Sequence, residues 1–151
     1  MNYLNTIDFL QREMWYPADR GDYKWTAQIE YKFLTRLLKM VDCGQWDGNP
    51  EHLQDGRQRR LCEGMNCEFD IHHQLNFYQA KINQLRDRFF KFGNLLEDPS
   101  VKWDPMHNTM EISVEQLQAY SAADRGYLAY QWHGEPMFFL LRGIFYIEED
   151  D

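Results

Sequence analysis

The sequence feature that most constrains the fold is a regular run of large apolar side chains in the middle of the chain. They recur at alternating steps of four and three residues, at Ile71, Leu75, Tyr78, Ile82, Leu85, Phe89 and Phe92. This spacing places all of them on one face of an α-helix, and it predicts a helix that Asp70 caps and Gly93 ends. A coiled-coil dimer shows the same spacing, but a second apolar stripe earlier in the chain favours pairing within one molecule.

That second stripe lies on a predicted helix that begins near Asp22 and ends near Asp42, just before Gly44. We expect the two helices to pack as an antiparallel pair through one set of side chains: Tyr31, Leu34, Leu38, Ile71, Leu75, Tyr78, Ile82 and Leu85. A further short amphipathic helix is predicted over residues 3–15, where apolar residues recur every three or four positions.

The C-terminal third of the chain has a different pattern. Short apolar segments at 101–103 and 109–112 predict strands, and the residues at 113–116 fit a capping box that opens a short helix. Residues 127–132 and 137–147 flank a turn-forming His-Gly-Glu-Pro sequence. This arrangement predicts a β-hairpin.

These patterns predict an α+β fold. N-terminal helices, which include an antiparallel helix pair, are expected to pack on a small C-terminal antiparallel sheet that ends in a β-hairpin. With 151 residues, we expect a single domain over 1–151. Its helical part would span about 3–95 and its mixed part about 100–147, followed by an acidic tail at 148–151.

The predicted strand at 137–147 is apolar on both faces, so both faces need to be covered. The protein's own helices are the favoured cover for the second face, and a second copy or a different protein is the alternative. Acidic residues follow the strand and would steer a basic partner. These residues form the candidate partner-binding site: Phe138, Leu140, Ile144, Tyr146, Glu148 and Glu149.

The segment 43–69 is predicted as a long loop between the two central helices. Loops of this length without structure of their own are often functional. The loop and the start of the next helix hold cysteine and histidine residues that could bind zinc: Cys43, His52, Cys62, Cys67, His72 and His73. Because no Cys-x2-Cys pair is present, we favour free thiols and no cofactor over a zinc site.

The formal net charge of −8 disfavours binding to nucleic acid, because a negative protein repels the phosphate backbone. One basic block is the exception, at Lys81, Arg86, Arg88 and Lys91. We interpret this block as a solvated helix face, or as the intramolecular partner of the acidic C-terminal third, rather than as a nucleic-acid footprint.

No glycine-rich phosphate loop and no Gly-x-Ser-x-Gly sequence is present, so a binding protein is favoured over an enzyme. We expect a small acidic adaptor, inhibitor or assembly subunit that binds another protein and that can self-associate. A basic groove on the partner is the candidate contact surface. A metal-dependent hydrolase or a zinc-stabilised module is the alternative. The chain shows no secretory signal and no membrane-spanning run, so we expect a cytoplasmic protein without membrane or nucleic-acid contacts.

Overall fold

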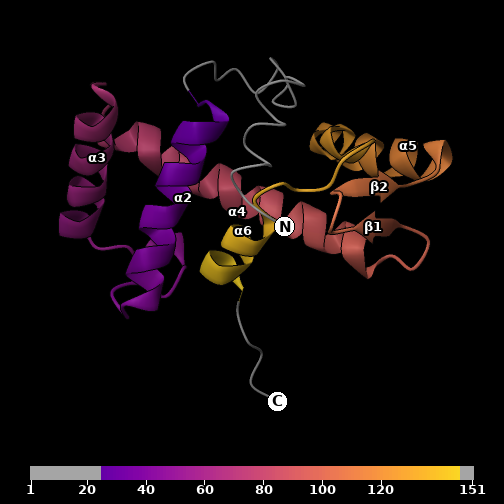
Figure 1. Cartoon of the computed structure of the whole chain (residues 1–151), viewed down its shortest axis with the longest axis horizontal. Coiled ribbons are helices and arrows are strands. Elements are labelled where there is room, and N and C mark those ends of the chain that lie inside the picture. Colours follow the sequence, from indigo (N-terminus) through magenta and orange to yellow (C-terminus); the bar gives the residue numbers. More distant parts are fainter. Residues whose placement is uncertain (1–24, 147–151) are drawn as a thin grey trace. The chain divides into compact units, whose positions relative to one another are not determined.

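The computed structural model describes residues 25–146, and Figure 1 shows its helices and strands. The elements follow in the order α2 (Ala27–Asp42), η2 (Pro50–His52), α3 (Asp55–Phe69), α4 (Leu75–Glu97), β1 (Lys102–Asp104), β2 (Thr109–Glu111), α5 (Val114–Ala123), η3 (Arg125–Tyr130) and α6 (Phe138–Phe145), where η marks a 3-10 helix. This composition confirms the expected α+β class with a small antiparallel sheet. The predicted helix at 3–15 and the acidic tail lie outside the described residues.

The chain divides into two compact units. The helical unit is built from Gln28–Asp87 and 139–146, and the hairpin unit from 25–27 and Arg88–Phe138. Helix α4 begins in the helical unit and ends in the hairpin unit. That the whole chain acts as a single domain stays a prediction.

The core of the helical unit forms where α2 meets α4. The rings of Phe33 and Tyr78 lie 5.6 Å apart, and Glu30 forms an ion pair with Lys81 at 2.8 Å. Phe33 follows Glu30 on α2, whereas its partner Tyr78 precedes Lys81 on α4. The two helices therefore run antiparallel. The buried apolar side chains of this core include Phe33, Leu34, Leu37, Leu61, Met65, Tyr78, Ile82 and Leu85.

The prediction of a loop over 43–69 is wrong, because α3 occupies its second half. The only buried side chains of α3 are Leu61 and Met65, one helical turn apart, so its apolar stripe is too short to stand out in the sequence. Asp70 ends α3 in a left-handed conformation, with φ 51° and ψ 51°, and does not cap the next helix. Helix α4 therefore begins later than expected, at Leu75, and continues to Glu97.

The hairpin unit contains the predicted first pair of strands. Strands β1 and β2 are antiparallel, with Trp103 opposite Met110. The predicted capping box is also present: Ser113 and Gln116 each accept a backbone hydrogen bond from the other at the start of α5. Apolar side chains from α4, the strands and η3 form the core of this unit: Phe92, Leu95, Val101, Met110, Tyr127 and Tyr130.

The prediction of a second hairpin at 127–147 is wrong, because these residues form η3 and α6. The apolar run after Met137 lacks the alternation of a half-buried strand, and a short continuous run fits a buried helix equally well. The argument for a second apolar strand face therefore does not apply. Leu140 and Ile144 are buried on α6 itself, Phe138 is half-buried and Tyr146 is exposed. Glu148 and Glu149 lie outside the described residues.

Across 25–146 no helix has both the length and the apolar character needed to cross a membrane.

Candidate functional site

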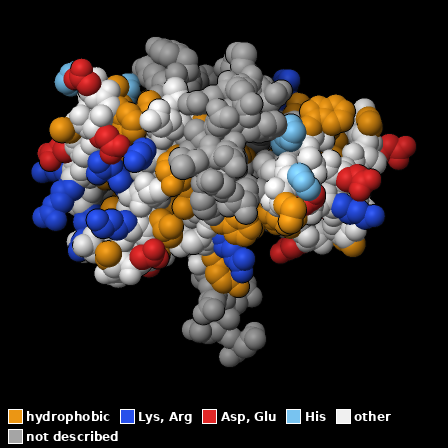
Figure 2. Space-filling model, in the orientation of Figure 1, with side chains coloured by type: hydrophobic (Ala, Val, Ile, Leu, Met, Phe, Trp, Pro, Cys, Tyr) orange, Lys and Arg blue, Asp and Glu red, His pale blue; other side chains and the backbone are white. Residues whose placement is uncertain are grey.

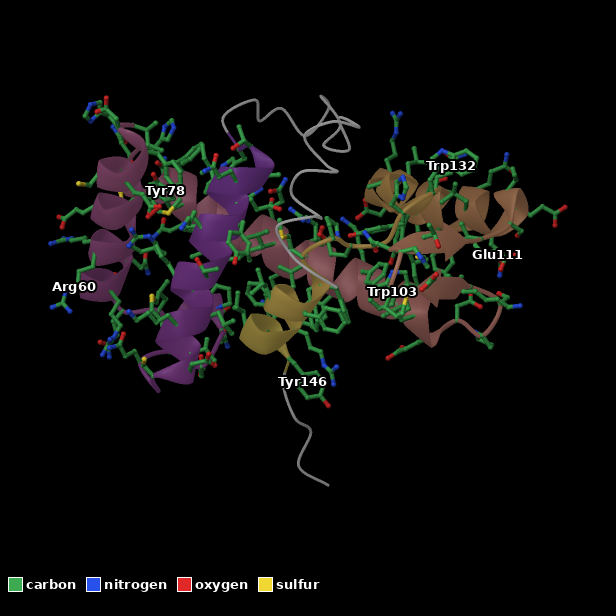
Figure 3. The ribbon with its side chains drawn as sticks, in the orientation of Figure 1. Arg60, Tyr78, Trp103, Glu111, Trp132 and Tyr146 are labelled. Carbon is green, nitrogen blue, oxygen red and sulfur yellow. The ribbon has the colours of Figure 1, made fainter. Side chains whose placement is uncertain are left out.

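A shallow groove of about 210 Å³ runs between α2 and α3 in the helical unit. We call it the α2–α3 groove and define it by its lining: Arg36, Lys39, Met40, Cys43, Gln45, Arg57, Arg60 and Leu61. Four of these eight side chains are cationic and none is a carboxylate. Figure 2 shows Lys and Arg side chains gathered over α2 and α3, and in Figure 3 Arg60 points outward from α3.

Helical spacing brings these cations to one place. Arg36 and Lys39 are three residues apart on α2, and Arg57 and Arg60 are three residues apart on α3, so each pair shares a helix face. The two pairs are separated by about twenty residues of sequence. The packing of α3 beside α2 brings these two pairs of cations together on one positively charged surface.

One of the four groove cations is neutralised within the fold. Arg36 donates a hydrogen bond to Glu68 at 2.8 Å and approaches the Gly64 carbonyl at 3.4 Å. By contrast, no ion pair joins Lys39, Arg57 or Arg60 to any residue between 25 and 146. The Nε–H of Arg57 is buried and finds no acceptor there either. The groove thus has positive charge left for an anionic ligand.

The basic block of α4 behaves differently. Lys81 pairs with Glu30 at 2.8 Å, and Lys91 pairs with Asp124 at 2.9 Å. Arg88 donates hydrogen bonds from Nε and Nη2 to the two carboxylate oxygens of Glu135. Glu135 also accepts a hydrogen bond from the Tyr130 hydroxyl at 2.8 Å. The interpretation of Arg88 and Lys91 as intramolecular partners of the acidic C-terminal third is confirmed.

The first half of α4 presents an uncharged polar surface. Asn76, Gln79 and Asn83 are exposed at successive turns, and we call them the amide face. Between Leu75 and Leu85 the single charged residue is Lys81, whose ammonium group is buried against Glu30. The amide face can therefore exchange hydrogen bonds with a ligand but adds no charge.

The six residues predicted as metal ligands do not come together. They are spread over the end of α2, η2, α3 and the turn before α4: Cys43, His52, Cys62, Cys67, His72 and His73. In the part of the chain that the structure describes, no three His, Cys, Asp or Glu side chains are arranged to hold a metal ion. His52 contacts Asp47 at 2.5 Å, and the Cys62 thiol lies 3.4 Å from the His73 carbonyl oxygen.

Cys62 lies on α3 in a partly buried position. Burial raises the pKa of the Cys62 thiol above its usual value, and the nearby carboxylate of Glu63 adds to the shift. A raised pKa favours the protonated thiol of Cys62 over the thiolate. The hypothesis of a zinc-stabilised or metal-hydrolase module is not supported by this geometry.

The model of one protein family, described as the Myb/SANT-like DNA-binding domain, matches residues 24–120. The chain belongs to this family. The match includes α2, α3 and α4 completely, and it extends through the strands into α5. Comparison with curated proteins and with solved structures gave no match.

Membership of the Myb/SANT-like family corrects the function expected from the sequence. An acidic adaptor, inhibitor or assembly subunit was the leading hypothesis, with nucleic acid considered an improbable partner, and both statements are wrong. The net charge was given more weight than any local surface, and the cations of the α2–α3 groove were not identified. A net charge describes the far field of the molecule, whereas binding depends on the local surface that meets the ligand.

Proposed function

We propose that this protein binds double-stranded DNA through its helical unit. The family match carries the proposal, because it covers every helix of the Gln28–Asp87 segment. The α2–α3 groove supports it, because four cationic side chains without a lining carboxylate suit the phosphate backbone. Phosphate contacts of this kind supply most of the affinity of a DNA-binding protein.

Helices α3 and α4 provide the elements of a helix-turn-helix. Helix α3 ends at Phe69 and α4 begins at Leu75 after a short connection. In such a motif the second helix enters the major groove of DNA and the first helix crosses the backbone. This assigns phosphate contacts to Arg57, Arg59 and Arg60 on α3, and base contacts to the exposed first half of α4.

The charges of the two units support the same assignment. In its described part the helical unit has nine Lys and Arg residues against nine Asp and Glu, so it is neutral. The hairpin unit has four against seven in its described part, so it is negative. DNA is repelled by the hairpin unit but meets no net repulsion at the helical unit, where the cations of the groove attract it locally.

An NMR titration tests the proposal. A 20-base-pair DNA duplex is added to the isotope-labelled full chain, and backbone amide shifts are followed residue by residue. We expect the largest shift changes at α3 and the first half of α4, with those of β1, β2 and α5 small. A heparin titration provides the control, since a polyanion without bases should perturb the α2–α3 groove and leave the amide face unchanged.

Two results would overturn the proposal. If the duplex causes no shift change at low salt, the protein does not bind DNA in this way. If the changes map to the strands and α5, the protein binds DNA through a different surface from the one proposed.

The expected location changes with the function. A protein that acts on chromosomal DNA has to reach the compartment that holds it, so we infer a nuclear location in a cell that has a nucleus. Imaging of the fluorescently tagged chain beside a DNA stain tests this inference, and a signal that avoids the stained region in all growth conditions would contradict it.

A further inference from the structure

The amide face on α4 differs in kind from the surfaces that bind phosphate. Asn76, Gln79 and Asn83 are exposed, whereas the one cation in this part of α4, Lys81, is held by Glu30 inside the fold. Without cations, this face gains little from the phosphate backbone. Its carboxamide groups each offer a donor and an acceptor, which is the pairing that a base edge presents.

A second observation concerns the hollow beside this face. About 230 Å³ in volume, it is lined by Gln79 and Asn83 of α4, by Gln58 of α3 and by the apolar side chains Leu53 and Ile82. Glu51 lines it as well, and a carboxylate at this position repels phosphate. The hollow therefore combines amide groups and apolar surface, and it is unsuited to the DNA backbone.

The amide of Gln79 is oriented by the fold. Its Nε2 donates a hydrogen bond to Oε1 of Gln58 on the neighbouring helix α3. This bond uses one donor and leaves the carbonyl oxygen and the second N–H of Gln79 for a ligand. A side chain that is held in place before binding loses less entropy when it binds.

We propose that the amide face reads A·T base pairs in the major groove, an inference that rests on the proposed function. Adenine presents N7 as an acceptor and the N6 amino group as a donor, and a carboxamide pairs with both at once. Thymine presents a methyl group, which favours apolar contact and suits the hollow, whose apolar lining consists of Pro50, Leu53 and Ile82. In a G·C pair, guanine presents two acceptors, N7 and O6, instead of an acceptor and a donor, and no methyl group is present.

The length of the amide face sets the size of the site. Asn76 and Asn83 are seven residues apart, which corresponds to about 10 Å along a helix at 1.5 Å per residue. Stacked base pairs repeat at about 3.4 Å, so the face spans about three base pairs. The target is therefore a short A·T-rich core, with flanking positions read weakly.

Base analogues test the proposal without altering the protein. Affinity is measured by fluorescence anisotropy at one salt concentration for four 20-base-pair duplexes: an A·T sequence, a G·C sequence, the A·T sequence with 7-deazaadenine, and the A·T sequence with uracil in place of thymine. We expect the A·T duplex to bind at least about ten-fold more tightly than the G·C duplex. Removal of adenine N7 should abolish most of this difference, and removal of the thymine methyl should reduce it.

A pair of variants locates the effect. Gln79→Ala and Asn83→Ala remove exposed amides, and Gln118→Ala removes an exposed amide from α5 as the matched control. We expect each of the first two to reduce the preference for A·T about five-fold or more and to lose part of the sensitivity to 7-deazaadenine. The control should retain the full preference and the full sensitivity.

The outcomes separate the two proposals. Equal affinity for the A·T and G·C duplexes, or an A·T preference that persists with 7-deazaadenine, would overturn the inference while DNA binding stands. A preference retained by both Gln79→Ala and Asn83→Ala would overturn it too. If none of the duplexes binds at low salt, the proposed function itself fails.

Discussion

The molecule contains two sets of Lys and Arg side chains, one on α4 and one in the α2–α3 groove, that differ in whether they form ion pairs within the fold. On α4, Lys81, Arg88 and Lys91 all pair with carboxylates, and the first two are almost completely buried. In the α2–α3 groove, Lys39 is exposed and Arg57 is half-buried, and neither forms an ion pair within the described chain. The first set holds the fold together, and the second is left for a ligand.

This difference shows that clustering in sequence is a poor guide to a binding surface. The cations of α4 lie close together in the sequence, so they are easily recognised as a basic block. In the structure, however, Lys81, Arg88 and Lys91 each pair with a different carboxylate of the same chain. The groove set is divided between two helices and becomes a cluster only after they pack. Variants of each set can separate the two roles, because one set should govern stability and the other DNA affinity.

The largest effect is expected for Arg88→Ala. This change leaves the carboxylate of Glu135 buried without its partner, where it is 0% exposed. An unpaired buried charge of this kind lowers the free energy of unfolding by about 3 to 5 kcal/mol. Urea denaturation followed by circular dichroism measures the change.

A double variant gives the control for that prediction. Replacement of both partners, with Arg88→Met and Glu135→Leu, removes the charges together and should restore much of the lost stability. If Arg88→Ala unfolds at the same urea concentration as the unmodified protein, the ion pair does not stabilise the fold. The claim that the α4 cations differ from the groove cations in this respect would then be wrong.

The next effect in size is expected for Lys39→Glu in the groove. Reversal of this exposed charge should weaken binding to a DNA duplex by about ten-fold or more, since it removes one phosphate contact and adds repulsion. The urea midpoint should stay unchanged, because Lys39 has no partner to lose among the described residues. Lys102→Glu, an exposed lysine of β1, is the matched control and should bind DNA almost as the unmodified protein does. An equal loss in both variants would mean that only net charge matters.

A smaller and opposite effect is expected for Glu68→Gln. Glu68 neutralises Arg36 at 2.8 Å, so its removal frees one groove cation for phosphate. Binding should become about two- to five-fold tighter, in keeping with the small energy of an exposed ion pair. Glu111→Gln removes an exposed carboxylate from β2 and provides the comparison (Figure 3). Weaker binding after Glu68→Gln would indicate that the ion pair positions Arg36 for DNA.

The smallest effect concerns acid stability in the hairpin unit. The hydrogen bond from Lys91 holds the pKa of the Asp124 carboxyl below its usual value of 3.8. A lowered folded-state pKa adds stability that is complete above pH 3.8 and is lost as the pH falls through the folded-state pKa. Asp124→Asn should therefore be less stable than the unmodified protein at pH 6, and the difference should shrink in denaturation experiments below pH 3.8. A constant difference at all pH values would contradict the ion-pair explanation.

Part of this structure follows from the sequence by simple periodicity. The stripe from Leu75 to Phe92 and the stripe on α2 are long and regular, and both predicted helices are present. The strands at β1 and β2 and the capping box at Ser113 were also found, because local turn and cap residues mark them. Signals of this kind are local, so they can be recognised in the sequence before the tertiary contacts are known.

Other elements could not be found in this way. Helix α3 buries only Leu61 and Met65, so its residues resemble a polar loop until α2 and α4 are in place. The run at α6 is apolar except for Arg142 and Gly143. For a segment this short the tertiary surroundings decide between strand and helix.

The candidate site was missed for the same reason as α3. Its cations lie on α2 and on an unpredicted helix, and the amide face consists of residue types that carry no charge signal. A signal was nevertheless present, because Arg57, Arg59 and Arg60 form a dense basic cluster in the segment that was predicted as a long loop.

The salt dependence of DNA affinity tests the central claim most directly. Each phosphate that a protein neutralises contributes about −0.9 to the slope of log affinity against log salt concentration. We predict that the double variant Arg57→Ala with Arg60→Ala has a slope shallower by about 1 to 2 than the unmodified protein, and that the control pair Lys102→Ala with Arg125→Ala keeps the original slope. An unchanged slope in the groove variant would contradict the assignment of phosphate contacts to the α2–α3 groove.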